Sequence, residues 1–277
     1  YKMINIGKTN TLKVNRLVEF GAYLTDDTAA DTEILLPRRY VDENLRPGDE
    51  IEVFVYNDSE DRPVATTERP IAQVGEVAVL EVVGTCRYGA FLDWGLPKDL
   101  LVPFGEQRAR MKMGGHYPVF IYLDDASKRI VASARLGKFL GNLLPSFSPG
   151  QEVDAVVYER TEIGFRCAVD SLHQGMLYSD ELFRPVSIGQ KLKAYVKNVR
   201  PDGRIDLSAA PDAKHRTRQL ADRIAATIET AGGHIAISDA SSPESIQAAF
   251  ECSKKDFKKA VGHLLKTGRV TRDMFGE

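Results

Sequence analysis

Aromatic and basic side chains surround one glycine in a pattern that suits the binding of single-stranded nucleic acid. Arg87, Tyr88 and Phe91 lie around Gly89, in a segment that predicts β-strands. Bases stack on aromatic rings while Arg and Lys follow the phosphates, and each stacked base contributes about 1–3 kcal/mol. Tyr88 and Phe91 are three residues apart, so they share one face only if Gly89 introduces a bulge.

The same aromatic pair occurs at an earlier place in the chain, as Phe20 and Tyr23. Core packing is the alternative for any single aromatic residue of a small barrel, and the recurrence favours a binding role. A third copy has Ile163 and Arg166 at these places, with Phe165 displaced by one residue. A displacement by one residue turns a strand side chain to the opposite face.

The third copy carries more basic residues than the others. Lysines alternate with apolar residues over 191–197, which in a strand gives one basic face and one apolar face. The candidate RNA-binding residues of this copy are Tyr178, Lys191, Lys193, Tyr195, Lys197 and Arg204.

Four lysines near the C-terminus form a further candidate phosphate contact. Their spacings of one, three and four residues place several ammonium groups along one side of a predicted helix. A solvated helix face is the alternative, with equal weight. The residues are Lys254, Lys255, Lys258 and Lys259.

A search for catalytic motifs gives none: the sequence contains no GxxxxGK[ST], GxSxG or HExxH, and no GxGxxG between a strand and a helix. The five histidines are scattered singly. The three cysteines lie 81 and 85 residues apart, a spacing that suits neither a disulfide framework nor a metal knuckle. We therefore expect no enzyme activity, no catalytic residue, no metal and no cofactor.

The distribution of charge is more informative than the net charge of −2, which argues against a uniformly basic protein. Residues 1–70 and 146–183 each carry a net charge of −5, whereas residues 184–218 carry +6. Such concentrated positive charge is typical of a local phosphate-binding surface, with a solvated charged linker as the alternative for 212–218.

Three internal repeats position these residues. Gly21, Gly89 and Gly164 recur at intervals of 68 and 75 residues, and a second glycine follows each before an alternating strand. About five short strands in each repeat of roughly 70 residues predict a small closed barrel of the OB type. An SH3-like barrel is the competing interpretation.

Beyond residue 213 the pattern becomes helical. A helix over about 214–231 is expected, then a short strand at 235–237, a helix after Ser242 and Pro243, and a helix capped by Ser253. A final strand over 269–271 completes a winged-helix unit, with a plain three-helix bundle as the alternative.

The fold predicted from these patterns is mainly β with a C-terminal α+β unit. We expect OB-fold domains at 1–69, 70–145 and 146–212 and a winged-helix domain at 213–277. No apolar run approaches the roughly 20 residues of a membrane-spanning helix, so we expect a cytoplasmic protein with no membrane partner.

The repeats resemble the RNA-binding domain of ribosomal protein S-one. The similarity lies in residues 79–92, 175–182 and 204–208. In that family two aromatic residues around the glycine and a later histidine stack on RNA. The histidine position corresponds here to Pro37, Pro103 and Tyr178, so the third contact is missing or altered in the first two repeats.

The whole chain resembles the conserved virulence factor B family, which joins three such domains to a C-terminal winged helix. The matching segments are residues 64–67, 91–103 and 253–262. The resemblance implies RNA binding and post-transcriptional regulation of gene expression without catalysis.

The leading hypothesis is therefore a non-catalytic RNA-binding regulator whose barrels contact single-stranded RNA in series. The ribosome or other nucleic-acid machinery is a further expected partner, and the oligomeric state is left open. One alternative is a DNA-binding transcription factor that uses the winged helix. Another is a nuclease, or an accessory protein whose barrels deliver the substrate to one.

Overall fold

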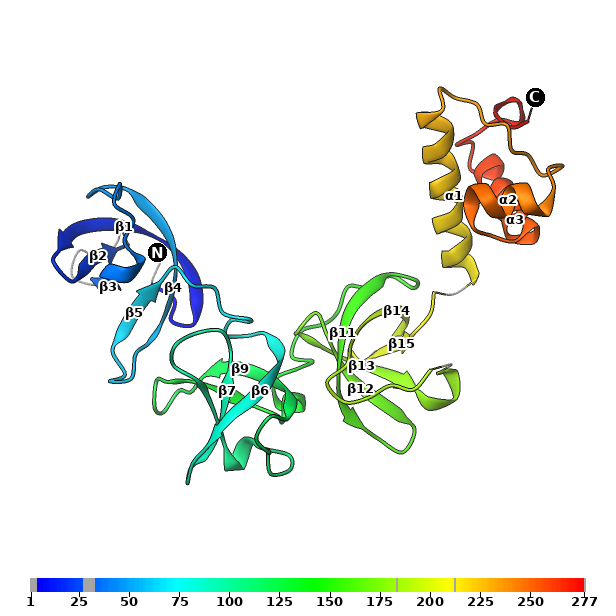
Figure 1. Cartoon of the computed structure of the whole chain (residues 1–277). Coiled ribbons are helices and arrows are strands. Elements are labelled where there is room, and N and C mark those ends of the chain that lie inside the picture. The colour runs from blue at the N-terminus through cyan, green and yellow to red at the C-terminus, as the bar shows by residue number, and fades with distance from the viewer. Residues whose placement is uncertain (1–3, 27–32, 183, 212, 277) are drawn as a thin grey trace.

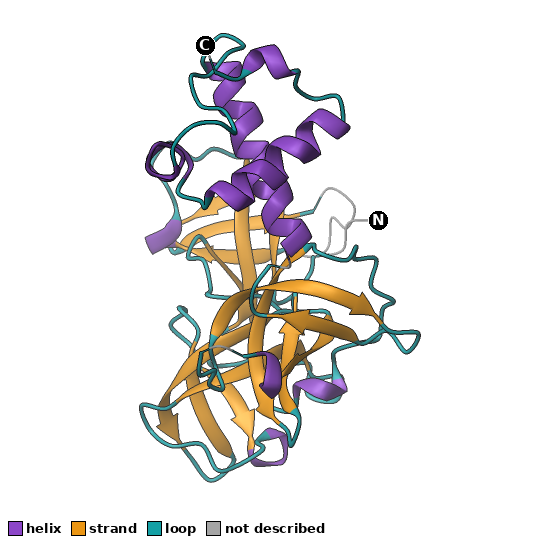
Figure 2. Ribbon diagram, turned by 90° about the vertical axis from the view of Figure 1, so that its right-hand side faces the viewer, coloured by secondary structure: helices purple, strands orange, loops and turns teal. Residues whose placement is uncertain are grey.

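The computed structural model describes residues 4–26, 33–182, 184–211 and 213–276. Three five-stranded barrels follow one another along the chain, and a helical region lies beyond the third (Figure 1). Figure 2 shows the helices of that region gathered at one end of the molecule. The predicted fold class of three OB-type barrels and a C-terminal winged-helix region is confirmed.

The three barrels share one strand order, in which the first strand pairs with the second and fourth, and the third pairs in parallel with the fifth. The first barrel contains β1 (Lys8–Val18), β2 (Gly21–Thr25), β3 (Ile34–Pro37), β4 (Glu50–Asn57) and β5 (Pro63–Thr66). The second contains β6 (Val77–Thr85), β7 (Gly89–Asp93), β8 (Leu100–Pro103), β9 (His116–Leu123) and β10 (Ile130–Ser133). The third contains β11 (Glu152–Arg160), β12 (Gly164–Val169), β13 (His173–Tyr178), β14 (Lys191–Val199) and β15 (Ile205–Ser208).

The glycine that opens the second strand of each barrel is required by the close approach of the next strand. A Cβ atom on Gly21, Gly89 or Gly164 would clash with the carbonyl oxygen of the residue before its partner on the third strand. The partner residues are Pro37, Pro103 and Tyr178. We call Gly21, Gly89 and Gly164 the landmark glycines. In each barrel the landmark glycine thus lies opposite the residue that corresponds to the histidine of the S-one family.

A bulge lies on the strand that neighbours Gly89. The register between β6 and β7 shifts between Val82 and Gly84, so that Gly84 lies opposite Phe91. The other two barrels have the same shift, which places Arg16 opposite Tyr23 and Glu159 opposite Arg166. Gly89 gives room to β8, whereas the extra residue belongs to the longer strand, β6.

The first and second barrels share an apolar interface. Phe54 of β4 packs edge-on against Trp94, with ring centroids 5.7 Å apart, and both side chains are buried. The Trp94 indole N–H donates to the carbonyl of Lys98 at 2.7 Å, so its polar atom is satisfied. Tyr56 and Val64 extend the same cluster into the core of the second barrel.

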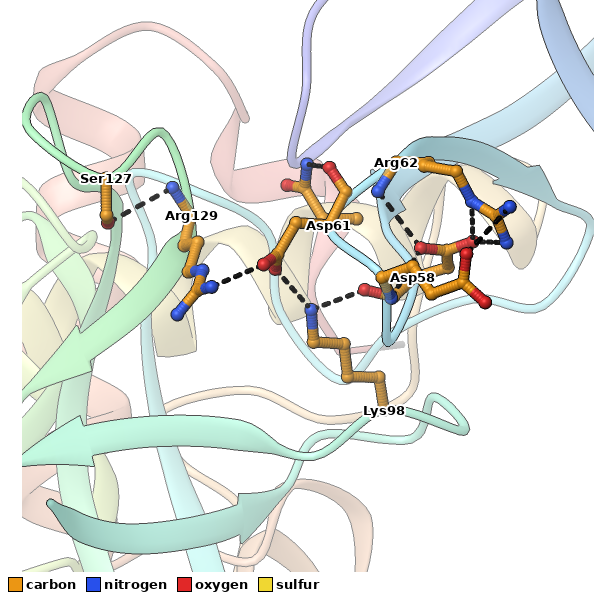
Figure 3. A network of polar contacts seen from close by, with 8 residues as sticks. Asp58, Asp61, Arg62, Lys98, Ser127 and Arg129 are labelled. Carbon is orange, nitrogen blue, oxygen red and sulfur yellow. Dashed lines mark hydrogen bonds and ion pairs between the residues drawn. The ribbon is translucent and has the colours of Figure 1, made fainter.

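A polar network closes the rim of this interface (Figure 3). Asp61, in the turn between β4 and β5, accepts hydrogen bonds from Arg129 and from Lys98 of the second barrel. The hydrogen bond from Arg129, followed by that from Lys98, lowers the pKa of the Asp61 carboxyl. Lys98 also donates to the carbonyl of Asp58 at 2.6 Å, which fixes the turn against the second barrel.

The second and third barrels meet through a separate apolar cluster. Phe120 of β9 stacks on Phe139 at 4.6 Å, and Tyr158 and Ala168 of the third barrel pack against them. The backbone N–H of Val77 donates to the Ser171 hydroxyl at 2.9 Å across this junction. The second barrel therefore has a packed partner on each side.

The C-terminal region contains α1 (Ala213–Thr230), α2 (Pro243–Phe250) and α3 (Lys254–Lys266), around Phe257, Ile224 and Leu264. Ser242 and Ser253 cap α2 and α3 as their positions predict, accepting from Ser245 N–H at 3.1 Å and from Asp256 N–H at 3.2 Å. None of the described helices has the length and apolar character to cross a membrane.

Two strands expected in this region are absent from the described residues. At 235–237 the structure has a single parallel bridge between Ile235 and Phe275. The strand expected over 269–271 does not form because the Arg269 N–H caps α3 by donating to Leu264, and a 3-10 turn begins at Arg272.

Candidate nucleic-acid interface

One exposed position recurs beside the landmark glycine of each barrel. Phe20, Tyr88 and Ile163 are 57%, 59% and 59% exposed. The backbone carbonyl of each of these residues accepts a hydrogen bond, at 2.9–3.0 Å, from the backbone N–H of the residue that follows the third strand of the same barrel. The barrels therefore present the same point to solvent, with an aromatic ring in the first two and an aliphatic side chain in the third.

The second barrel combines this ring with positive charge. The Arg87 guanidinium lies 4.7 Å from the centroid of the Tyr88 ring, within the range of a cation–π contact. Arg87 is exposed, so it can follow a phosphate while Tyr88 stacks on a base. Phe91, the other member of the predicted pair, is half-buried beside Gly84.

A hollow of about 500 Å³ lies next to Tyr88, and two of its residues were missed by sequence reasoning. Phe104 is 39% exposed, and the Arg110 guanidinium lies 5.0 Å from its ring centroid. The Phe104 N–H donates to the Tyr88 carbonyl at 3.0 Å, which holds the two residues side by side. The sequence signal that could have identified Phe104 is its position directly after Pro103, which corresponds to the RNA-stacking histidine of the S-one family.

The first barrel carries a second version of the aromatic–basic pair. Phe20 and Tyr23 meet edge to face, with ring centroids 6.2 Å apart. Arg16 lies 4.0 Å from the Tyr23 centroid and also pairs with Glu33 at 2.8 Å. The hydrogen bond from Arg16, with a second from Asn15, lowers the pKa of Glu33, so the carboxylate stays charged and offsets the arginine.

The basic stripe of the third barrel has the predicted alternation. Ala194 and Val196 are buried, and Lys191, Lys193 and Lys197 are exposed. Phe165 is half-buried and packs against the core, as its one-residue displacement predicts.

Carboxylates oppose most of this stripe. Strand β11 is the neighbour of β14, and its Asp154 pairs with Lys193 at 2.8 Å. Lys197 pairs with Glu181 at 2.5 Å. The Tyr195 hydroxyl donates to Glu152 at 3.1 Å, and Arg204 lies 3.7 Å from Asp202. The positive charge of this segment is therefore largely compensated where it folds.

Tyr178 lies in a network rather than as an open ring. Its hydroxyl donates to Asp206 at 3.0 Å and accepts from Arg200. Burial, followed by the hydrogen bond to Asp206, raises the pKa of the Tyr178 hydroxyl. Burial alone would raise the pKa of Asp206, but the hydrogen bonds from Arg200 and Tyr178 outweigh it and lower that pKa.

Three of the four candidate lysines of the helical region are exposed on α3. Lys255, Lys258 and Lys259 face solvent, whereas Lys254 is half-buried and donates to the Ser241 carbonyl at 2.8 Å. Within the described ranges no group of three or more His, Cys, Asp or Glu side chains is placed to hold a metal ion.

Comparison with known proteins assigns these domains. The S1 domain model matches residues 6–68 and 74–135, and the CvfB-like winged helix domain model matches residues 222–274. Both are nucleic-acid-binding families. The S1 and winged-helix domains thus indicate a multidomain protein of a nucleic-acid-binding class.

Relatives resemble the chain over most of its length. The chain is 28% identical to "Uncharacterized protein YitL" of Bacillus subtilis, over 96% of this chain and 91% of that protein. It is 25% identical to "Conserved virulence factor B" of Staphylococcus aureus, over 83% of this chain and 81% of that protein. A solved multidomain protein with nucleic acid binding domains from Streptococcus pneumoniae matches with a TM-score of 0.42 and 23% identity, over 98% and 97% of the two chains. These domains and relatives confirm the resemblance to the conserved virulence factor B family that the sequence motifs predicted.

Proposed function

We propose that this chain is a cytoplasmic, non-catalytic protein that binds single-stranded RNA and regulates gene expression after transcription. The supporting observation is the exposed ring of Tyr88 beside Arg87, at a position that Phe20 repeats in the first barrel. Rings held open to solvent at equivalent points of successive barrels suit the stacking of bases from one strand.

Several weak sites in series strengthen the proposal. The first two barrels are fixed against each other by the Phe54–Trp94 contact and the Asp61 network. A strand bound at Tyr88 therefore meets the Phe20 site at high effective concentration without a large ordering cost. Ribosomal or other RNA machinery is the partner that such a protein would meet on a transcript.

The decisive experiment replaces Tyr88 with Ala and measures binding of a labelled single-stranded RNA oligonucleotide. Loss of one stacked base, worth about 1–3 kcal/mol, corresponds to weakening of about five- to 150-fold. Ile163→Ala is the matched control because Ile163 is equally exposed but presents no ring. Equal affinities of wild type and Tyr88→Ala would remove Tyr88 from the site.

The alternatives are tested in the same assay. Competition between single-stranded RNA and duplex DNA at matched salt separates an RNA-binding protein from a DNA-binding factor that uses the exposed lysines of α3. Incubation of labelled RNA with Mg²⁺ or Mn²⁺ tests for a nuclease. Cleavage by the pure protein, or preference for duplex DNA, would contradict the proposed function.

A further inference from the structure

The loop that leads from the third strand of each barrel to the fourth differs in charge among the three barrels. In the second barrel, residues 107–115 contain Arg108, Arg110 and Lys112 and no carboxylate. The equivalent residues of the first barrel, 41–49, contain one arginine and three carboxylates, and those of the third, 182–190, contain one arginine. Loops on a rigid scaffold commonly carry the binding residues. We call residues 107–113 the basic loop.

The basic loop is held in place by hydrogen bonds at both ends. The Gln107 side chain is buried, and its amide donates to the Val102 carbonyl at 3.1 Å and accepts from the Met111 N–H at 3.0 Å. The Lys112 N–H donates to the Tyr117 hydroxyl at 3.1 Å. The three cationic side chains of the loop remain exposed. A loop that is ordered before its ligand arrives loses little conformational entropy on binding.

The cations of the basic loop face two different places. The Arg110 guanidinium lies 5.0 Å from the centroid of the Phe104 ring, in the hollow beside Tyr88 that Lys112 also lines. Arg108 instead lines a groove of about 360 Å³ where the second barrel meets the third, which we call the junction groove. The basic loop therefore extends from the candidate stacking site to the next barrel.

Both barrels contribute cations to the junction groove. Arg135 and Lys138, at the 3-10 turn that follows β10, line it on the side of the second barrel, together with Arg108. Arg166 of β12 lines it on the side of the third barrel. Arg166 occupies in the third barrel the position that Phe91 has in the second. The groove thus reaches the face of the third barrel that corresponds to the aromatic face of the second.

One carboxylate at this junction is shared by two arginines. Arg108 and Arg166 both pair with Glu159, Arg166 at 3.0 Å. The hydrogen bond from Arg108 lowers the pKa of Glu159, so the carboxylate is charged at neutral pH. A single negative charge cannot neutralise two guanidinium groups, and the side chains of Arg108 and Arg166 are 40% and 45% exposed. Both arginines therefore keep N–H donors for a phosphate.

The other two cations of the junction groove add to the positive excess. Lys138 pairs with Glu106 at 2.8 Å, and the Arg135 Nε–H donates to the uncharged carbonyl of Gly105 at 2.9 Å. Four cations thus share two carboxylates in the described part of the chain, whereas carboxylates oppose most of the basic stripe on β14. A groove lined by an excess of one charge attracts ligands of the opposite charge.

We propose that the basic loop and the junction groove form a continuous phosphate path that leads single-stranded RNA from the Tyr88 site of the second barrel to the third barrel. Bases stack at Tyr88, and Arg110, Arg108 and Arg166 contact successive phosphates along the strand. The third barrel then contributes a cation where the second contributes a ring. The inference rests on the proposed function, because it extends the RNA site at Tyr88.

Arg108→Ala removes one cation of the path and leaves no carboxylate unpaired, because Glu159 keeps Arg166. A single-stranded RNA of about 12 nucleotides, long enough for more than one barrel, should bind about fivefold more weakly. The slope of log affinity against log salt should become shallower by about 0.7, the value for one lost phosphate contact. Arg69→Ala is the matched control, because it removes an arginine from an exposed ion pair with Glu52 outside the groove. The control should leave the slope unchanged.

Glu159→Gln tests the same groove with the opposite sign. The substitution keeps the shape of the side chain and removes the charge that offsets Arg108 and Arg166, so the same RNA should bind about two- to fivefold more tightly and with a steeper salt dependence. Glu60→Gln, which removes a carboxylate from an exposed pair with Arg62, is the control. If the arginines only fasten the two barrels together, Glu159→Gln should lower the unfolding temperature without tightening RNA binding, which would contradict the path.

The length of the RNA separates failure of the path from failure of the proposed function. An RNA of about four nucleotides, enough for one barrel, should respond to Tyr88→Ala and not to Arg108→Ala, whereas the longer RNA should respond to both. Equal losses of the two RNAs in Arg108→Ala, or an unchanged affinity and slope in both groove variants, overturn the path. If Tyr88→Ala still weakens binding in that case, the proposed function stands. If wild type binds neither RNA, both fail.

Discussion

The second and third barrels share a scaffold but present different chemistry at the same point. In the second, Arg87 and Tyr88 precede the landmark glycine, whereas the third has Glu162 and Ile163 there. Tyr88 and Ile163 are equally exposed, so the backbone does not decide which barrel can stack on a base. The identity of two side chains does.

The comparison also separates net charge from available charge. The segment around β14 holds the largest positive excess in the sequence, but Asp154 and Glu181 pair with Lys193 and Lys197. In the second barrel, the cations Arg87 and Arg110 instead lie over exposed rings. We therefore expect the smaller excess beside aromatic faces to give the better binding surface.

The largest expected effect tests the scaffold that both barrels share. Gly89→Ala and Gly164→Ala each place a Cβ atom against a backbone carbonyl that no rotamer change can move. Each should lower the free energy of unfolding by about 3 kcal/mol, the upper end of typical overpacking costs, in urea denaturation. Gly105→Ala, where a Cβ meets open space, should change it little. A harmless Gly164→Ala would show that the third barrel does not use the same strand spacing.

The next largest effect is expected when the third barrel is given the arginine–tyrosine pair of the second. Glu162→Arg with Ile163→Tyr gives the third barrel the pair found in the second, at a position that is already exposed. One added stacking contact, worth about 1–2 kcal/mol, should tighten RNA binding roughly five- to thirtyfold in a filter-binding assay. Glu162→Arg alone separates the added charge from the added ring. If the double variant binds no better than this control, the exposed ring is not sufficient for binding.

Sequence alone predicted the scaffold, because it depends on local patterns, whereas the aromatic site stays a prediction. Alternation with period two defined the strands, and the spacing of Gly21, Gly89 and Gly164 defined the repeats. Cross-strand pairing is not local: Lys193 meets Asp154 only through the register between β14 and β11. The contact between Phe104 and Arg110 depends on how a loop packs against the barrel, so no local pattern predicts it.

A smaller effect on stability is expected from the hydrogen bonds that join Tyr178, Asp206 and Arg200 in the third barrel. Asp206→Asn should lower the free energy of unfolding by about 1–2 kcal/mol at pH 7, since the charged hydrogen bonds from Arg200 are weakened. The folded pKa of Asp206 is lowered, so its contribution is present above about pH 4 and is lost as pH falls below that value. The stability difference between wild type and variant should therefore shrink as pH falls below about 4 in urea denaturation. Asp202→Asn, at an exposed pair, should change stability little, and a constant difference down to pH 3 would contradict the assignment.

The smallest expected effect tests whether ion pairs with carboxylates keep the lysines of β14 from contacting phosphates. Asp154→Asn removes the 2.8 Å partner of Lys193 and leaves Glu152 at 3.8 Å, so the ammonium becomes more available to a phosphate. Exposed ion pairs are weak, so RNA affinity at low salt should rise only about two- to threefold. The slope of log affinity against log salt should steepen by about 0.7 if one more phosphate is contacted. Asp125→Asn makes the same charge change beside Lys128 in the second barrel and should leave the slope unaltered.

Equal slopes for the two variants would mean that β14 does not contact the RNA and that the charge difference between the barrels does not affect binding.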